Sequence, residues 1–155
     1  MPIILNDFVK EVLDAPCYGF LGVINESYQP VITRFFGFKY DNPLTILTLY
    51  TFKKDAQRVV NQLSEGVKIA ATTSNAMDYK TIQFKGTYLK HYDVPQDEMN
   101  YARQCNAKQA KIIEMFGISN KVWANWSFEP SVAIAINVKE LFDQTPKINT
   151  GNKIN

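Results

Sequence analysis

The sequence has few of the residues that most often carry metal or nucleophilic chemistry. It contains one histidine, His91, and two cysteines, Cys17 and Cys105, that lie far apart in the chain. No CxxC pair is present, and no spacing of cysteine with histidine could complete a metal site. We therefore predict two buried thiols and no metal. His91 has no positioned partner nearby, so we expect an exposed or hydrogen-bonded strand residue rather than a catalytic base.

Sequence motifs of several large enzyme classes are missing as well. The chain has no GxGxxG, no P-loop, no HExxH and no G-x-S-x-G, which argues against a dinucleotide fold, a zinc protease and a serine hydrolase. No run approaches the roughly 18 apolar residues of a membrane span. The opening MPIILNDFVKEVLD lacks the basic segment and long apolar core of a signal peptide. We accordingly expect a cytoplasmic protein with no membrane partner.

Charge shows no strong bias of either sign. Lys and Arg number 17 and Asp and Glu 15, for a net charge of +2, which does not indicate a nucleic-acid partner. The chain has 155 residues, of which 46% are hydrophobic, enough for one globular domain. We predict a single domain over residues 1–145 and a polar tail over 146–155.

The first half of the chain predicts a helix followed by three strands. Apolar residues recur at helical spacing from a cap at Asn6 until Pro16 ends the helix. β-rich runs then occupy residues 18–25, 30–39 and 44–51, separated by turn-forming residues. We interpret them as a meander, in which each strand pairs with the next.

The second half predicts two further helices and three more strands. An amphipathic helix follows Thr51, with Ala56, Val59, Val60 and Leu63 on its packing face and Asp55 as a cap. Strands are expected at 67–74, at 79–92 with a bulge at Gly86, and at 131–138. A helix over 96–116 is expected to place Tyr101, Cys105, Ile112 and Phe116 on one side, whereas 123–128 is expected to be irregular.

This order of elements favours a mainly β (β+α) fold. The six predicted strands are antiparallel, and a long apolar antiparallel sheet generally closes on itself to remove its edges. We therefore predict a six-stranded antiparallel β-barrel with flanking helices. Acidic side chains are expected to be solvated caps or helix-surface groups, and they are Asp7, Glu11, Asp55, Glu65 and Glu98.

Basic residues gather where the third strand passes into its helix. Arg34 and Lys39 lie on the second strand, and Lys53, Lys54 and Arg58 lie around the helix start. Neighbouring strands would bring these side chains together, and Arg and a helix N-terminus both match phosphate oxygens. Lysine pairs in turns are also commonly just solvated charge. A phosphate site and an ordinary solvated turn therefore both remain open.

Three segments follow one another in the order GFLGVIN-ESYQPVITRFFGFKYD, LTLYTFKKDAQRVVNQLSEGVKIAAT and YKTIQFKGTYLK. In their order and spacing the chain resembles the flavin-binding split barrels of the pyridoxamine 5′-phosphate oxidase-like superfamily. The resemblance runs from about Asp14 to Lys90, and more loosely to Asp143. Within these segments it includes a Gln-Pro turn and an Arg followed five residues later by Lys.

The resemblance implies a split β-barrel that binds FMN at a homodimer interface. The residues that it places against the cofactor are Thr33, Arg34, Lys39, Tyr50, Thr51, Lys54, Gln57, Arg58 and Thr81. Arg34, Lys54 and Arg58 would hold the phosphate. Gln57 stands where the oxidases have Arg, and Thr81 where they have Gln. The last third of the chain lacks the Trp and Arg pattern of the true oxidases, so flavin binding is better supported than pyridoxamine oxidation.

Several functions are compatible with this resemblance. If the protein is an enzyme, we expect an FMN-dependent oxidoreductase with an unassigned small-molecule substrate. The alternatives are a flavin carrier or stress-related sensor without turnover, and a dimeric scaffold with a degenerate site. Related barrels also bind a deazaflavin or haem. His91 is the one histidine in the chain that could be a haem ligand. An exposed aromatic face made of Phe35, Phe36, Tyr50 and Phe52 is expected to be covered by the second subunit.

Overall fold

The computed structural model describes residues 2–126, 129–148 and 150–154. The helices are α1 (Asp7–Asp14), α2 (Lys53–Val60), α3 (Gln96–Met115) and α4 (Asn120–Trp126). The strands are β1 (Cys17–Ile24), β2 (Pro30–Phe35), β3 (Phe38–Tyr40), β4 (Ile46–Thr51), β5 (Lys68–Asn75), β6 (Thr81–Asp93), β7 (Val132–Asp143) and β8 (Asn152–Lys153).

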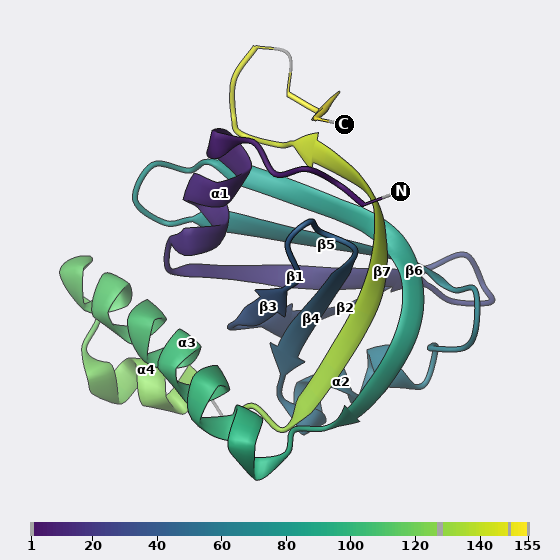
Figure 1. The fold of residues 1–155 in the computed structure, drawn as a ribbon. Helices are drawn as coiled ribbons and strands as arrows, with labels where there is room; N and C mark the ends of the chain where they lie inside the picture. The colour runs from purple at the N-terminus through teal and green to yellow at the C-terminus, as the bar shows by residue number, and fades with distance from the viewer. Residues whose placement is uncertain (1, 127–128, 149, 155) are drawn as a thin grey trace.

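The strands form one strongly curved antiparallel sheet (Figure 1). Its order is β2-β1-β5-β6-β7-β4-β3, and β8 pairs with the end of β7. The predicted barrel with flanking helices is confirmed as a β+α split barrel. The described residues form eight strands where six were expected, because the 30–39 run breaks into β2 and β3 and because part of the polar tail pairs with β7.

A corner at Phe36 and Gly37 separates β2 from β3. The two strands follow each other in the chain, yet they lie at opposite ends of the sheet order. The Phe36 N–H donates to the Tyr50 carbonyl at 3.2 Å, and the Tyr50 N–H donates to the Gly37 carbonyl at 2.9 Å. The chain itself therefore joins the two edges of the sheet. The pairing predicted for the meander is confirmed, since the first half of the 30–39 run pairs with β1 and its second half with β4, but the run is not one continuous strand.

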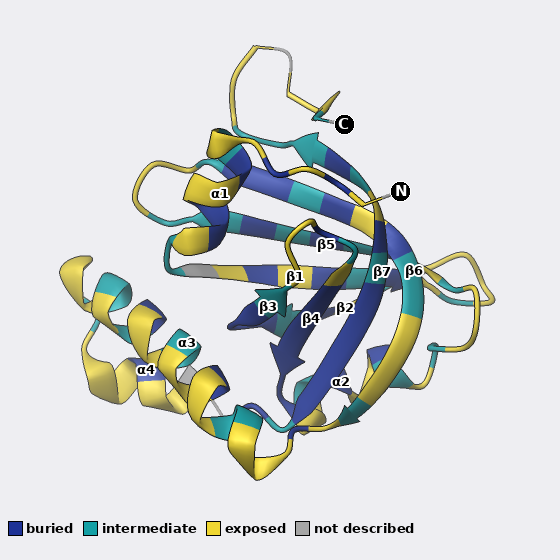
Figure 2. Ribbon diagram, viewed as in Figure 1, coloured by how far each residue is buried: buried dark blue, intermediate teal, exposed yellow. Residues whose placement is uncertain are grey.

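The barrel interior is filled by apolar side chains that alternate along the strands. Fully buried examples from five strands are Leu21, Phe35, Leu49, Ile82, Phe84, Ile134 and Ile136. Strands β4 and β7 are buried along most of their length, whereas α3 is largely exposed (Figure 2). Gly86 marks a register shift between β6 and β7, as predicted, and a Cβ there would lie 2.2 Å from the Asn137 carbonyl oxygen.

Helix α1 lies at one end of the barrel (Figure 1). The Asn6 side chain accepts a hydrogen bond from the Val9 N–H at 2.9 Å, so the predicted cap is confirmed. Val9, Val12 and Leu13 reach the main core. The helix ends at Asp14, shortly before Pro16, because proline disfavours helical geometry in the residue before it.

Helices α3 and α4 pack beside the corner and bury a small aromatic cluster. Phe36, Phe52 and Trp123 form it, and the Phe36 and Trp123 ring centroids lie 5.3 Å apart. The prediction of an irregular 123–128 segment is wrong up to residue 126, which belongs to α4, and residues 127 and 128 lie outside the described residues. The aromatic residues of this segment made its helical spacing hard to recognise in the sequence. In the structure the backbone N–H of Trp123 donates to the Ser119 carbonyl at 3.1 Å, in the first turn of α4.

The packing face of α3 differs from the predicted one. Its buried residues are Ala102 and Gln109, whereas Tyr101 and Phe116 are about half exposed. The difference arises because α3 approaches the sheet through small residues: a Cβ added to Gly37 would lie 2.4 Å from the Cys105 Cβ. Cys105 is only partly buried, and the Cys17 side chain lies outside the described set.

The aromatic face predicted to meet a second subunit is wrong. Phe35, Phe36, Tyr50 and Phe52 are all at most 5% exposed. Phe35 points into the barrel, and the other three lie in the layer under α3 and α4. Among the described helices, none is long and apolar enough to cross a membrane.

Substituting Gly37 by alanine tests the close approach of α3 to the corner. Gly37→Ala should lower the free energy of unfolding by about 1–3 kcal/mol, because the new methyl overlaps Cys105 and the helix must shift. Urea unfolding measures the change. Gly22→Ala is the matched control, since its Cβ would meet Ile32 Cγ2 at 3.4 Å and the Val31 carbonyl oxygen at 3.9 Å, both ordinary contacts, and it should cost less than about 0.5 kcal/mol. Equal losses in both variants would show that the corner is not tightly packed.

Candidate functional site

A hollow of about 340 Å³ lies between α2 and the outer side of β1 and β2. Its lining residues are Phe20, Ile32, Thr33, Arg34, Lys54, Asp55 and Arg58. The four predicted site residues brought together here are Thr33, Arg34, Lys54 and Arg58. The corner between β2 and β3 explains this grouping, because it turns the chain so that α2, which follows β4, returns alongside β2.

Arg34 is held by a carboxylate inside this hollow. Its Nε donates to Asp55 Oδ2 at 3.1 Å, and its Nη2 donates to the same oxygen. The guanidinium also lies over the Phe36 ring, 5.5 Å from the centroid. Because the pair uses only two of the five guanidinium N–H groups, the Nη1 edge keeps a fork of donors for an anion.

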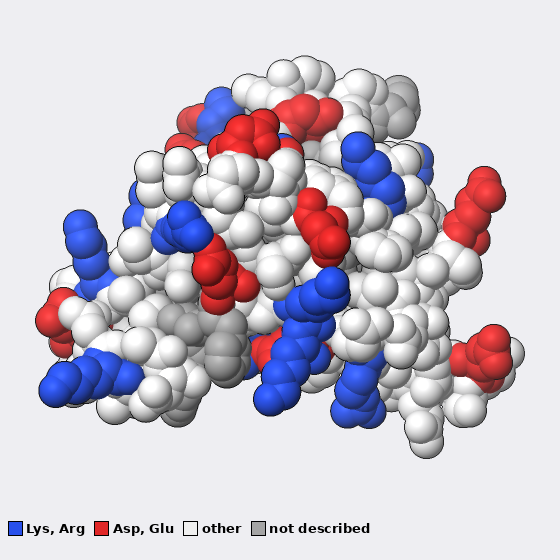
Figure 3. All heavy atoms as spheres, turned by 90° about the horizontal axis from the view of Figure 1, so that it is seen from below, with Lys and Arg blue, Asp and Glu red and all other residues white. Residues whose placement is uncertain are grey.

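Lys54 and Arg58 add two cations on one face of α2. They are four residues apart, so their side chains project in the same direction. Both are exposed, and within the described ranges neither has an ion pair. The hollow therefore combines three cations with one carboxylate. Seen from the α2 side of the molecule, basic and acidic side chains are interspersed rather than separated into fields (Figure 3).

A second cluster of polar groups joins α3 to the sheet at Glu98. Its carboxylate accepts hydrogen bonds from the Tyr50 hydroxyl at 2.9 Å and the Tyr92 hydroxyl at 3.2 Å, and it pairs with Lys39 Nζ at 2.6 Å. Lys39, Tyr50, Glu98 and Tyr101 line a hollow of about 320 Å³ beside it. Two predicted flavin contacts, Lys39 and Tyr50, are thus placed here and not at the α2 hollow.

Hydrogen bonds shift the pKa values of this cluster. Burial raises the pKa of Glu98, but the hydrogen bonds from Lys39, Tyr50 and Tyr92 outweigh it and leave that pKa below its ordinary value. Burial and the bond to Glu98 raise the pKa of Tyr50. Burial also raises the pKa of Tyr101 to about 12. Glu98 is therefore an ionised acceptor surrounded by neutral phenols and one lysine.

The three remaining predicted site residues line neither hollow. Thr51 is fully buried, and its hydroxyl donates to the Val132 carbonyl at 3.2 Å. Gln57 lies exposed on α2 and donates to the Asn61 side chain at 2.8 Å. Thr81 begins β6, where its hydroxyl donates to the Tyr79 carbonyl at 2.9 Å. In this chain the Gln57 and Thr81 side chains make local hydrogen bonds, and Thr51 ties β4 to β7.

Two acidic residues differ from the prediction of solvated groups. Asp55 binds Arg34 instead of capping α2, whose N-cap, Phe52, makes no side-chain cap bond. Glu98 is only 22% exposed and has three polar partners. Their partners lie 21 or more residues away in the chain, except for Tyr92, so the sequence carried no local signal for either role. His91 is exposed and hydrogen-bonded to the Tyr88 hydroxyl, as predicted.

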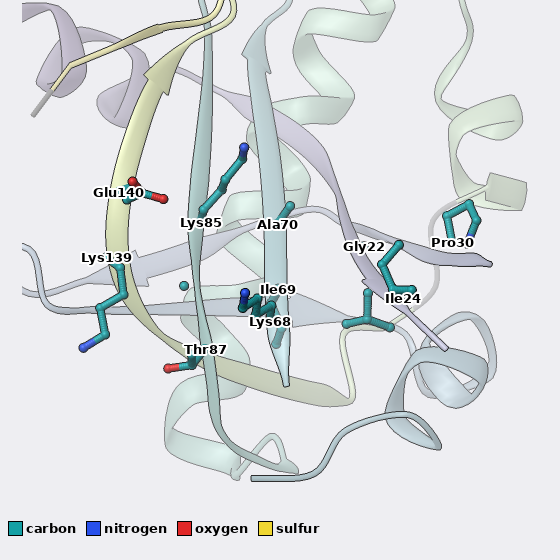
Figure 4. A pocket seen from close by; sticks show the side chains of 12 residues that line it. Gly22, Ile24, Pro30, Lys68, Ile69, Ala70, Lys85, Thr87, Lys139 and Glu140 are labelled. Carbon is teal, nitrogen blue, oxygen red and sulfur yellow. The ribbon is translucent and has the colours of Figure 1, made fainter. Parts of the chain in front are cut away.

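A larger hollow of about 580 Å³ lies on the outer face of the sheet (Figure 4). Its floor consists largely of small and apolar residues from β1, β5 and β6, with lysines around it; Gly22, Ile24, Ala70, Gly86, Lys68, Lys85 and Lys139 are members. None of the predicted site residues lines it. Large apolar side chains are exposed on the β1 and β2 part of the same face, and they are Tyr18, Phe20, Ile24 and Ile32.

Comparison with known proteins identifies the fold but not the activity. No protein-family model matches the sequence, and no curated protein matches it either. Among solved structures, an F420 reductase matches with a TM-score of 0.54 at 13% identity, over 89% of this chain and 98% of that one. HupZ from Group A Streptococcus matches with a TM-score of 0.57 at 13% identity, over 96% of this chain and 98% of that one.

A third structure is named for the family that the sequence resembles. It is a Clostridium acetobutylicum protein related to general stress protein 26 and described as of the pyridoxinephosphate oxidase family. It matches with a TM-score of 0.49 at 14% identity, over 96% of this chain and 91% of that one. At such low identities a likeness shows the fold alone. The matches to the F420 reductase and to HupZ, whose TM-scores exceed 0.5, show that this chain shares their fold.

The lowered pKa of Glu98 predicts a pH-dependent contribution to stability. A carboxyl whose pKa is depressed in the folded state stabilises the protein above its unfolded pKa of about 4.3, and this is lost as pH falls through the folded pKa. Between pH 6 and pH 3 the wild-type protein should lose about 1 kcal/mol more of its free energy of unfolding than Glu98→Gln. The figure is modest because Lys39 is 43% exposed.

Urea unfolding across this pH range measures the difference. Asp97→Asn removes the neighbouring carboxylate, which has no ion pair within the described part of the chain, and should keep the wild-type dependence on pH. If Glu98→Gln also keeps that dependence, the carboxylate is not stabilised by its hydrogen bonds.

Proposed function

We propose that this split barrel binds FMN, with the phosphate in the α2 hollow. The observation that carries the proposal is the gathering of Arg34, Lys54 and Arg58 around one cavity of about 340 Å³. Arg34 is paired with Asp55, but Lys54 and Arg58 have no ion pair in the described ranges, and such cations favour an anionic ligand because they otherwise repel one another. Arg matches phosphate oxygens through two parallel N–H groups, and Lys acts as a point charge.

The residues of the hollow fit the phosphate end of the cofactor. Arg34 would donate from its Nη1 edge, and Lys54 and Arg58 would approach from α2. Phe20 and Ile32, which are 46% and 61% exposed, offer apolar contact next to the charged groups. The predicted contacts to the flavin ring, Tyr50, Thr51 and Thr81, do not line this hollow within one chain. The residues of the hollow therefore support binding of the phosphate rather than of the ring.

A homodimer is the second part of the proposal. The exposed apolar side chains of β1 and β2 lie beside both the α2 hollow and the large outer groove. A contiguous apolar surface of this kind is commonly covered by a partner. A second subunit on this face would close the α2 hollow and supply the remaining contacts to the flavin. A cytoplasmic location and the single-domain boundary at 145 stay predictions.

The activity that we propose is that of a flavin-dependent oxidoreductase. A bound flavin supplies hydride or electron transfer, while the protein supplies binding, orientation and charge. The similarity in fold to an F420 reductase supports a flavin-type redox partner. Steady-state oxidation of a nicotinamide donor by the FMN-loaded protein tests turnover. Bound flavin with no turnover would favour the alternative function of a carrier or stress-related sensor.

Removing Arg58 should separate phosphate binding from flavin binding. Arg58→Ala should weaken FMN about tenfold to a hundredfold and leave riboflavin nearly unchanged, because only FMN carries the phosphate. Quenching of flavin fluorescence measures both affinities. Lys53→Ala is the matched control, since Lys53 lies on the same helix but pairs with Asp93 at 3.8 Å and does not line the hollow. Equal losses for FMN and riboflavin would contradict the assignment of Arg58.

A charge placed on the apolar face should separate the subunits. Ile24 is 57% exposed and lines the outer groove, so Ile24→Glu should convert a dimer into a folded monomer. Sedimentation velocity at micromolar concentration measures the change. Ile148→Glu is the control, because Ile148 is 89% exposed in the segment after β7, and it should remain dimeric. A monomeric wild-type protein would refute the dimer.

A further inference from the structure

The α2 hollow contains a carboxylate that a simple phosphate site does not need. Asp55 lines the cavity together with the three cations, and its side chain is 24% exposed. A carboxylate beside a phosphate repels it, so its presence lowers the affinity for an anion alone. Arg34 offsets this charge, and the carboxylate leaves a hydrogen-bond acceptor next to the cations of the hollow.

The two oxygens of Asp55 have different surroundings. Oδ2 accepts both hydrogen bonds from Arg34. Oδ1 has no hydrogen-bond partner in the described ranges, and the carboxylate lies in the wall of the cavity. An ionised carboxylate only accepts hydrogen bonds, so Oδ1 can accept one from a ligand hydroxyl.

We propose that Asp55 reads a hydroxyl group of the ligand, so that the hollow selects a phosphorylated polyol over a bare phosphate. The inference rests on the proposed phosphate site and names the ligand chemistry that this site prefers. In this arrangement Asp55 Oδ2 holds the Arg34 guanidinium so that its Nη1 edge faces the phosphate. Asp55 Oδ1 accepts a hydrogen bond from a hydroxyl on the carbon chain next to the phosphate. Asp55 is thus a specificity-determining residue.

Asp55→Asn tests the proposal with two probes, inorganic phosphate and ribitol 5-phosphate. The asparagine amide has one acceptor oxygen, which cannot accept from both Arg34 and the ligand hydroxyl in the places of Oδ1 and Oδ2, and its NH₂ group is a donor. It also removes the negative charge that repels phosphate. The variant should therefore bind ribitol 5-phosphate about tenfold more weakly and inorganic phosphate about threefold more tightly. Isothermal titration measures both dissociation constants.

A crossover of the two affinities is the supporting result. Changes in the same direction overturn the proposal: a joint gain means that Asp55 only repels anions, and a joint loss means that it only positions Arg34. Failure of the wild-type protein to bind either probe also overturns it. Asp93→Asn is the matched control, because it removes the same charge from the partner of Lys53 without lining the hollow, and both affinities should change less than about twofold.

FMN titration distinguishes this proposal from the proposed function. Neither probe contains a flavin, so a crossover in a protein that binds no FMN would sink flavin binding alone. FMN binding through Arg58 without a crossover would sink the role of Asp55 alone. Asp55→Asn keeps an acceptor oxygen for Arg34, so the variant should remain folded. A melting curve checks this.

Discussion

The corner at Phe36 and Gly37 is the constraint on which the rest of the structure depends. It lets one stretch of chain pair with β1 on one side and with β4 on the other, so that the two edges of the sheet are joined covalently. Two backbone hydrogen bonds to Tyr50 hold it. The absence of a Gly37 side chain also lets Cys105 of α3 come close. Closure of the barrel and the packing of α3 against it thus both depend on Phe36 and Gly37.

The same corner divides the basic residues between two places. Arg34 lies before it and faces α2, whereas Lys39 lies after it and faces α3. A spacing of five residues along one straight strand would also have put the two side chains on opposite faces of the sheet. In the folded chain Lys39 neutralises Glu98 and ties α3 to the sheet. The α2 hollow therefore depends on Lys54 and Arg58, which the helix presents on one face.

The sequence predicted most of the regular structure, because alternation and helical spacing are local signals. The cap at Asn6, the bulge at Gly86 and the helix after Thr51 all follow from residues close together in the chain. Pairing of Asp55 with Arg34 spans 21 residues and that of Glu98 with Tyr50 spans 48. No local pattern carries such contacts. The resemblance to a family gave the barrel and pointed to three of the residues that line the α2 hollow, Arg34, Lys54 and Arg58, but not to the carboxylate within it.

The central claim is that the cations of the α2 hollow hold the phosphate of a flavin cofactor. A crystal structure of the protein with FMN tests it most directly. We predict a phosphate within hydrogen-bonding distance of the Arg34 Nη1 edge and Arg58, with the Arg34–Asp55 pair still in place. A phosphate held beside Lys39 and Glu98, or in the outer groove next to Lys68 and Lys85, would contradict it.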